Sequence, residues 1–257
     1  MTAQSEQKPV LWQLEVSHYS EKVRWALDYK RVDHIRRSPL PGTHIPISLL
    51  LTRGAHHTVP VLEMDGRTIG DSTEIIAALD AKFLDPPLYP SKPDERLRAL
   101  ELEEWFDENL GPHTRLLPFY ELIQEPELFG EVAASQVPGP LGKVKPVVGA
   151  YARFYTSLRW GANKGEDAER ARAGIVAALD KLEAELGAGD GEFLVGESLS
   201  VADVTAASLF YPLVVPPGGP LSPDLPRPPA FDRFRDELSE RPGYKWVEET
   251  YRRHRYS

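Results

Sequence analysis

No cysteine occurs in this sequence of 257 residues. Its absence excludes disulfides, zinc sites with thiolate ligands and every mechanism that needs a thiol nucleophile from the protein. The absence fits a reducing compartment, although only weakly. Any thiol chemistry of this protein must therefore use a thiol that a ligand brings.

Long apolar runs and a broad basic surface are also lacking. No stretch approaches the ~20 consecutive apolar residues of a membrane-spanning helix, and the opening MTAQSEQKPV has no signal-peptide core. We therefore expect a cytoplasmic protein with no membrane partner. The net charge of −9 argues against nucleic-acid binding, and the basic cluster YRRHRYS at the end is predicted to be a solvated helix end.

The first part of the chain alternates strand and helix signals. Hydrophobic residues make up 41% and charged residues 27%, as in folded soluble proteins. Asp65 and Gly66 lie between two apolar runs, which is a strong hairpin signal. The predicted order is βαβαββα, with strands at 10–16, 34–40, 59–64 and 67–70, helices at 20–30 and 71–83, and a short helix or turn at 46–54.

The composition changes after residue 84. Prolines cluster between Pro86 and Pro93 and predict a linker, and the periodicity that follows is helical. Helices are predicted at 94–112, 166–191 and 198–213, the first ending at Gly111 and Pro112 and the third interrupted at Pro212, with two short helices after residue 229. The helical periodicity between residues 111 and 164 is the weakest in this part of the chain. The sequence thus predicts an α/β domain at 1–84 and an all-α domain at 93–257.

This chain resembles the glutathione transferase superfamily, in which a thioredoxin-like domain is joined to a helical domain. Four segments in family order carry the resemblance: SHYSEKVRWAL, TVPVLEMDG, GDSTEIIAAL and FLVGESLSVADVTAASL. The resemblance implies glutathione as co-substrate, no metal, a small hydrophobic electrophile as second substrate, a homodimer and a role in detoxification. Another low-molecular-weight thiol in place of glutathione stays open.

Ser17 stands at the turn where serine-type members place a hydroxyl that donates a hydrogen bond to the glutathione sulfur. Such a bond, together with the positive end of the following helix, lowers the pKa of a thiol from its usual ~8.5. Ser17 would thus activate the thiol of the bound ligand. The alternative is that Ser17 only caps the helix. Tyr19 is a lower-ranked hydroxyl donor. Ser20 matches the family's second cysteine position and is expected to cap, so mixed-disulfide chemistry is excluded.

Two further motifs are expected to bind the thiol ligand. By resemblance, the bond before Pro60 is cis and the backbone of Val59 pairs with the cysteinyl part of glutathione; a trans loop proline is the alternative. Asp71 and Ser72 begin a helix, and a helix N-terminus binds anions. We expect Ser72 to hold the γ-glutamyl carboxylate while Asp71 faces its ammonium, which is compatible with capping.

The remaining candidates are three basic residues that could bind the ligand and one helix start that serves folding. His57, with His56 and Arg53, lies where family members meet the glycyl carboxylate, although most surface histidines have no such role. Ser200 and Asp203 form a capping-box pattern before an apolar run, and we assign them to folding of the helical domain.

The expected function is that of a serine-type glutathione transferase, which activates a bound glutathione thiolate for attack on a small apolar electrophile. Two alternatives stay open. One is a non-catalytic binding or regulatory module with this fold, and the other is a glutathione-dependent isomerase, dehalogenase or etherase. Fold alone does not decide among them.

Overall fold

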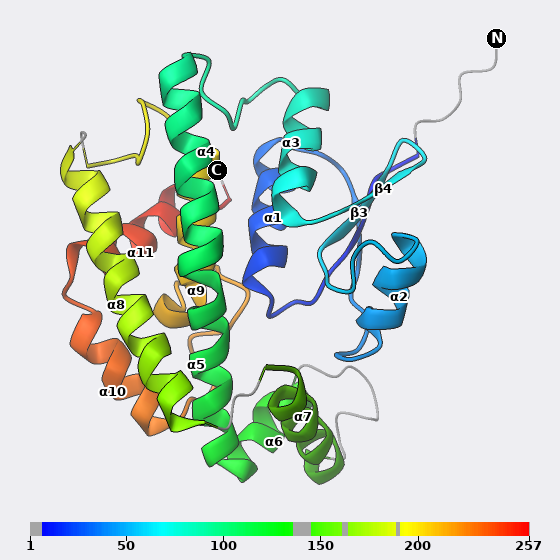
Figure 1. The fold of residues 1–257 in the computed structure, drawn as a ribbon, viewed down its shortest axis with the longest axis vertical. Coiled ribbons are helices and arrows are strands. Elements are labelled where there is room, and N and C mark those ends of the chain that lie inside the picture. Colours follow the sequence, from blue (N-terminus) through cyan, green and yellow to red (C-terminus); the bar gives the residue numbers. More distant parts are fainter. Residues whose placement is uncertain (1–6, 136–144, 161–163, 189–190, 257) are drawn as a thin grey trace.

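The computed structural model describes residues 7–135, 145–160, 164–188 and 191–256. The N-terminal part, blue to cyan in Figure 1, confirms the predicted βαβαββα order. Its elements are β1 (Val10–Trp12), α1 (His18–Tyr29), β2 (Ile35–Arg37), α2 (His44–Leu51), β3 (Val61–Met64), β4 (Arg67–Gly70) and α3 (Ser72–Lys82).

The four strands form one mixed sheet in the order β2-β1-β3-β4. β1 runs parallel to β2 and antiparallel to β3, so that Leu11 pairs with Arg36 on one side and with Leu62 on the other. Leu11 and Leu62 are fully buried, and α1 and α3 lie between the sheet and the rest of the molecule (Figure 1). This arrangement brings the starts of α1, β3 and α3 to one edge of the domain.

The remainder is helical, as predicted. Its elements are α4 (Pro93–Asn109), α5 (Gly111–Gln124), α6 (Pro126–Ser135), α7 (Lys145–Trp160), α8 (Gly165–Ala188), α9 (Val201–Val214), α10 (Pro229–Leu238) and α11 (Pro242–His254). Every residue of α9 is buried, and α1, α4, α5 and α11 all pack against it. In Figure 1 the α6 and α7 pair lies beneath α2, away from the main bundle.

The start of α9 confirms the predicted capping box. Asp203 accepts hydrogen bonds from the backbone N–H of Ser200 at 2.8 Å and of Leu194 at 2.7 Å. The hydroxyl of Ser200 also donates to Asp203, at 2.7 Å. Burial raises the pKa of Asp203 to about 6, against the lowering effect of these bonds. This carboxyl group therefore joins the loop before α9 to the centre of the bundle.

Two predicted helix features are wrong. Gly111 and Pro112 begin α5, because a proline in the first turn loses no helical hydrogen bond. Pro212 does not interrupt α9, which continues to Val214 and ends at Val215 in the left-handed conformation (φ 49°). The proline lies in the last turn of a helix buried on all sides, so packing outweighs its cost of ~3 kcal/mol.

β1 is shorter than the predicted strand at 10–16 and ends at Trp12. The backbone beyond it turns away from the sheet to bind Arg24 of α1. The guanidinium of Arg24 donates to the carbonyl of Glu15 at 2.9 Å and of Leu14 at 3.4 Å. Hydrogen bonds from the buried Arg24 side chain therefore take the place of strand pairing just before the turn that holds Ser17.

The C-terminal basic cluster is not entirely a solvated helix end, contrary to expectation. Arg255 is buried, at 3% exposure. It donates to Glu21 of α1 at 2.6 Å and to Asp28 at 2.9 Å, and its guanidinium lies 5.6 Å from the ring centroid of Trp25. The end of the chain is thus fixed against α1.

A second buried ion pair joins the two domains near the edge that carries Ser17. Lys22 of α1 contacts Glu103 at 2.8 Å and Asp107 at 2.6 Å, both on α4, and donates to Thr73 of α3 at 3.1 Å. These contacts fix α1, α3 and α4 relative to one another.

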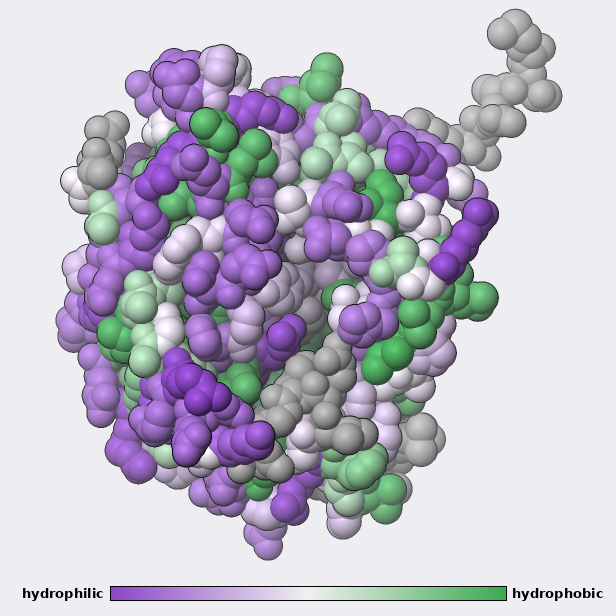
Figure 2. Space-filling model, viewed as in Figure 1, coloured by the Kyte–Doolittle hydropathy of each residue, from purple (hydrophilic) through white to green (hydrophobic). Residues whose placement is uncertain are grey.

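Within the described ranges, no helix is long and apolar enough to cross a bilayer. Figure 2 shows mostly hydrophilic residues over the bundle and hydrophobic residues at the edge over α2, where Leu50 is 81% exposed.

Candidate active site

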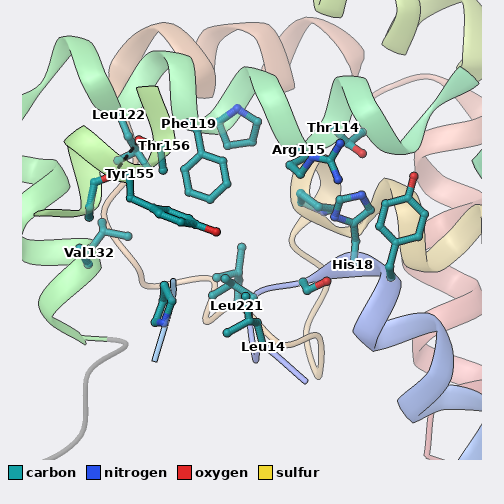
Figure 3. A pocket seen from close by; sticks show the side chains of 18 of the residues that line it. Leu14, His18, Thr114, Arg115, Phe119, Leu122, Val132, Tyr155, Thr156 and Leu221 are labelled. Carbon is teal, nitrogen blue, oxygen red and sulfur yellow. Dashed lines mark hydrogen bonds between the residues drawn. The ribbon is translucent and has the colours of Figure 1, made fainter. Parts of the chain in front are cut away.

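A cavity of about 650 Å³ lies between the two domains. The turns that begin α1, β3 and α3 form one wall, and α5, α6, α7 and the loop after α9 form the opposite wall. Figure 3 shows His18 and Arg115 at one end of the cavity and Phe119, Leu122 and Tyr155 at the other. Six of the seven residues expected to bind the thiol ligand line it: Ser17, Tyr19, Val59, Pro60, Asp71 and Ser72.

Ser17 is the N-cap of α1, and its side chain borders the cavity. Its Oγ accepts a hydrogen bond from the backbone N–H of Ser20 at 3.2 Å. A hydroxyl can accept and donate at the same time, so this cap leaves the Ser17 O–H able to donate to a ligand. Ser20 is fully buried and accepts from the N–H of Leu14 at 3.4 Å, which holds the turn together.

Tyr19 uses its hydroxyl within the protein. It donates to the carbonyl of Asp107 at 2.8 Å, and burial and the Asp107 carboxylate raise the pKa of Tyr19 far above its usual value. A Cβ at Gly111 would come within 2.1 Å of this hydroxyl, so the close approach of α1 to α5 requires glycine there. Among the hydroxyls of the turn, Ser17 is thus better placed than Tyr19 to serve a ligand.

His18 was not recognised in the sequence, although it lines the cavity beside Ser17. Its Nε2 lies 3.0 Å from the carbonyl of Gly111, which can only accept, so Nε2–H donates. Burial, followed by the charge of Arg115, lowers the pKa of His18 to about 3. His18 therefore carries no charge at neutral pH.

The bond between Val59 and Pro60 is cis, which confirms that expectation. Both residues line the cavity immediately before β3, Pro60 buried and Val59 half-buried. Asp71 caps α3 through Oδ1, which accepts from Thr73 N–H at 2.9 Å and Glu74 N–H at 3.2 Å. Ser72 is buried at the first position of α3 and faces the same cavity.

His57 is the exception among the predicted residues. It is exposed and does not belong to the described lining of the cavity. His56 packs over Gly70, and Arg53 is exposed in the turn after α2. His44 of α2 lies in the lining instead; its Nδ1 accepts from Gly42 N–H at 3.1 Å, which puts the proton on Nε2.

The opposite wall is mainly apolar and aromatic. Tyr151 lines the cavity, whereas Phe106 belongs to the core and Phe154 is exposed. The hydroxyl of Tyr151 donates to the carbonyl of Pro41 at 3.1 Å and so joins α7 to the N-terminal domain. The side chain of Trp160, at the end of α7, lies outside the described residues. The sequence alone did not single out Phe119, Phe129, Tyr155 and Phe231.

Neither wall suggests a metal site. In the parts of the chain that the structure describes, no group of three His, Cys, Asp or Glu side chains could hold a metal ion. The two walls themselves can serve an anionic, hydrogen-bonding molecule at the helix ends and an apolar molecule opposite them.

Comparison with known proteins identifies the family. The model of the glutathione S-transferase N-terminal domain matches residues 11–87, and that of the C-terminal domain matches residues 165–242. The chain belongs to the glutathione transferase superfamily. This family uses glutathione as co-substrate, which supports a glutathione-dependent activity.

Curated relatives and solved structures agree with this membership. A probable maleylacetoacetate isomerase of Caenorhabditis elegans is 24% identical over 93% of this chain and 92% of its own. A probable glutathione S-transferase of Nicotiana tabacum is 26% identical over 86% of this chain and 79% of its own. A beta-etherase of Sphingobium shares the fold with a TM-score of 0.60 at 20% identity, over 95% of this chain and 100% of its own. A zeta-class maleyl pyruvate isomerase has a TM-score of 0.61 at 18% identity, over 94% and 91%.

Proposed function

We propose that this protein is a serine-type glutathione-dependent enzyme, in which Ser17 stabilises the thiolate of bound glutathione for attack on a small electrophile. One observation carries the proposal. Ser17, Val59 and the start of α3 meet on one wall of a cavity whose other wall is apolar. A thiolate and an electrophile bound on these walls would be adjacent, which supplies the proximity that a reaction between two molecules needs.

Ser17 would act on a thiol that is not its own. Its Oγ accepts the cap hydrogen bond from Ser20, and its O–H is directed by hydroxyl rotation to the ligand sulfur. A hydrogen bond to a charged group contributes about 1.5–3 kcal/mol, and the N-terminus of α1 adds to it. Together they would lower the pKa of the bound thiol by about 1–2 units from ~8.5, which would raise the thiolate fraction at neutral pH several-fold or more.

The rest of glutathione would lie along the same wall. Asp71 uses Oδ1 for both cap hydrogen bonds, so Oδ2 can accept from the γ-glutamyl ammonium. The N–H and hydroxyl of Ser72 would hold the γ-glutamyl carboxylate at the positive end of α3. The backbone of Val59 would pair with the cysteinyl group. His57 would require a movement to reach this ligand and stays the weakest of the predicted contacts.

The reaction itself has two candidate forms. In a transfer, the thiolate sulfur bonds to carbon and the leaving group departs with its electron pair. In an isomerisation, the sulfur adds to a double bond, the adduct rotates, and the thiolate is expelled again. The second form is favoured by the names of curated relatives from Caenorhabditis elegans and Dictyostelium discoideum, which are maleylacetoacetate isomerases.

The experiment compares Ser17→Ala with Ser20→Ala, a matched hydroxyl deletion in the same turn. Glutathione binding is measured by calorimetry, and conjugation is measured with 1-chloro-2,4-dinitrobenzene. We expect kcat/KM to fall about 10- to 100-fold in Ser17→Ala and less than threefold in folded Ser20→Ala. Failure of the wild-type protein to bind glutathione would favour the non-catalytic module instead. Homodimer formation, cytoplasmic location and a role in detoxification also stay predictions.

A further inference from the structure

The backbone just before Ser17 is held by a side chain, because β1 ends before it reaches this turn. Arg24 of α1 donates to the carbonyl of Glu15 at 2.9 Å and to that of Leu14 at 3.4 Å. It also donates to the side-chain carbonyl of Gln13 at 2.8 Å. One guanidinium thus binds three consecutive residues of the segment that leads to Ser17.

Glu21 of the same helix fixes this guanidinium. Its Oε2 accepts a hydrogen bond from Nε of Arg24 at 2.7 Å, and its backbone N–H donates to the carbonyl of Ser17 at 2.9 Å. The other carboxylate oxygen, Oε1, accepts from Nε of Arg255 at 2.6 Å. Glu21 is therefore bonded to the Ser17 turn, to the side chain that holds this turn, and to the end of the chain.

The end of the chain, marked C in Figure 1, is anchored on two sides. Arg255 lies 234 positions after Glu21 in the sequence and also donates to Asp28 at 2.9 Å. The hydroxyl of the next residue, Tyr256, donates to the carbonyl of Gly218 in the loop after α9, at 2.7 Å. These contacts hold the Arg255 guanidinium against the first turns of α1.

The burial of this network is not explained by stability. Arg24, Glu21 and Arg255 are between 1% and 3% exposed. Replacing a buried ion pair by apolar residues is often neutral or stabilising, because both ions lose their hydration. An apolar side chain at position 24, however, would leave the carbonyls before Ser17 without this donor. What the charged network adds is therefore the position of the turn.

None of the three charged residues belongs to the described lining of the cavity, whereas Leu14 and Ser17 do. An influence of the network on a bound ligand would consequently pass through the turn. A hydrogen bond from the Ser17 hydroxyl to a thiolate depends steeply on distance and angle. A displacement of about 1 Å in a reacting geometry can reduce a rate by ~100-fold.

We propose that Arg24 is a positioning residue for Ser17 and that the end of the chain supports it. Arg255 acts through Glu21, the carboxylate that it shares with Arg24. The inference rests on the proposed function and concerns the control of the same site. Thiol activation at one end of the sequence then depends on a guanidinium at the other end.

Conservative variants test the network in the full-length protein. Arg24→Lys keeps the charge but not the planar fork, so one ammonium replaces donors to several acceptors. We expect the pKa of the glutathione thiol bound to Arg24→Lys to rise by about 0.5–1 unit, and kcat/KM at pH 7 to fall about three- to tenfold. The Kd for glutathione should change less than about twofold, because the ligand contacts remain. Arg255→Gln should shift the thiol pKa in the same direction by about half as much.

Two controls separate positioning from a general loss of structure. Arg253→Gln changes an exposed arginine two residues before Arg255, paired with Glu192 at 3.3 Å, and should keep the wild-type thiol pKa. Asp203→Ala removes the buried cap of α9 and should lower stability with no change in the thiol pKa. An equal rise of the thiol pKa in Asp203→Ala or Arg253→Gln would overturn the proposal.

A double variant shows whether Arg24 acts through Ser17. In the Ser17→Ala background, Arg24→Lys should cause no further rise of the thiol pKa, since the group that it positions is gone. A rise as large as in the wild-type background would contradict the proposal. The pKa is read from the ultraviolet absorbance of the thiolate in each variant.

Hydrogen exchange tests the network without any ligand. Mass spectrometry of peptides that cover residues 13–20 should show about tenfold faster amide exchange in Arg24→Lys and Arg255→Gln than in the wild-type protein or Arg253→Gln. Absence of glutathione binding would contradict only the proposed function, and the exchange rates would still decide whether the network holds the turn. Unchanged exchange in both variants would overturn the positioning role. If Arg24→Lys does not fold, as judged by circular dichroism, Arg255→Gln decides.

Discussion

The wall of the cavity that faces the thiol ligand is made of short side chains and backbone at the ends of secondary-structure elements, whereas the helical wall is made of long side chains from the middle of helices. Ser17 and Asp71 are fixed by hydrogen bonds to amides two or three residues away. Phe119 and Tyr155 are placed by contacts with other side chains: the ring centroid of Phe119 lies 6.5 Å from that of Phe129, and the hydroxyl of Tyr155 lies 3.5 Å from Nε2 of His44. The first wall suits a ligand with constant polar groups, and the second can change its shape without disturbing the first.

Substitutions outside both walls should change stability and leave binding intact. Asp203→Ala removes the acceptor for two buried backbone N–H groups, at Ser200 and Leu194. We expect the free energy of unfolding to fall by about 3 kcal/mol, since each unpaired buried donor costs about 1–3 kcal/mol. Urea unfolding measures this loss, and Asp236→Ala, an exposed position, should change it by less than about 0.5 kcal/mol. A large loss of glutathione affinity with unchanged stability would show that Asp203 belongs to the site.

On the thiol-facing wall, Asp71→Ala should weaken glutathione binding about 10- to 100-fold. The substitution removes the cap of α3 and the acceptor for the ligand ammonium. Calorimetry gives the Kd. Asp65→Ala is the matched control, because Asp65 also has a positive φ and an exposed carboxylate, bound to Lys82 at 2.6 Å, but lies in the β3–β4 turn. Equal glutathione affinities of Asp71→Ala and Asp65→Ala would show that Asp71 does not bind this ligand.

On the helical wall, Phe119→Ala should raise the KM for 1-chloro-2,4-dinitrobenzene about fivefold to tenfold. The loss of apolar contact with the second substrate corresponds to ~1 kcal/mol for a half-buried ring. The Kd for glutathione should change less than twofold. Phe154→Ala on α7 is the control, since Phe154 is 67% exposed and outside the described lining. If Phe119→Ala weakened glutathione binding as much as electrophile binding, the claim that the two walls bind different ligands independently would be contradicted.

A pH dependence of stability is also expected. Burial raises the pKa of Asp203 to about 6 from 3.8, so the folded protein holds a proton that the unfolded chain releases between these values. The free energy of unfolding of the wild-type protein relative to Asp203→Asn should therefore fall as pH rises from about 4 to about 6. Urea unfolding at a series of pH values measures the difference. A rise over the same range would mean that the cap hydrogen bonds outweigh burial.

The same contrast between walls explains what could be predicted from the sequence. The βαβαββα order and the residues Ser17, Pro60, Asp71 and Ser72 could be found because each lies at a helix or strand end, where caps and prolines leave a local signal. Their convergence on one cavity follows from the fold. Their contacts with a ligand stay a prediction.

The remaining features depend on residues far apart in the chain. Arg115 and Tyr155 have no local signal, because their exposure to the cavity depends on how α5 and α7 pack. Gly111 and Pro212 are typical of helix ends in a sequence, but tertiary packing decides where their helices begin and end. Arg255 was assigned to solvent because its partner Glu21 lies near the other end of the chain.

The central claim is that Ser17 lowers the pKa of a bound thiol. The pH titration of the ultraviolet absorbance of the thiolate, recorded for glutathione bound to the wild-type protein and to Ser17→Ala and Ser20→Ala, tests it most directly. We predict a wild-type thiol pKa about 1–2 units below the usual ~8.5, a rise of about 1 unit or more in Ser17→Ala, and no rise in Ser20→Ala. Equal thiol pKa values in the wild-type protein and Ser17→Ala would contradict the claim.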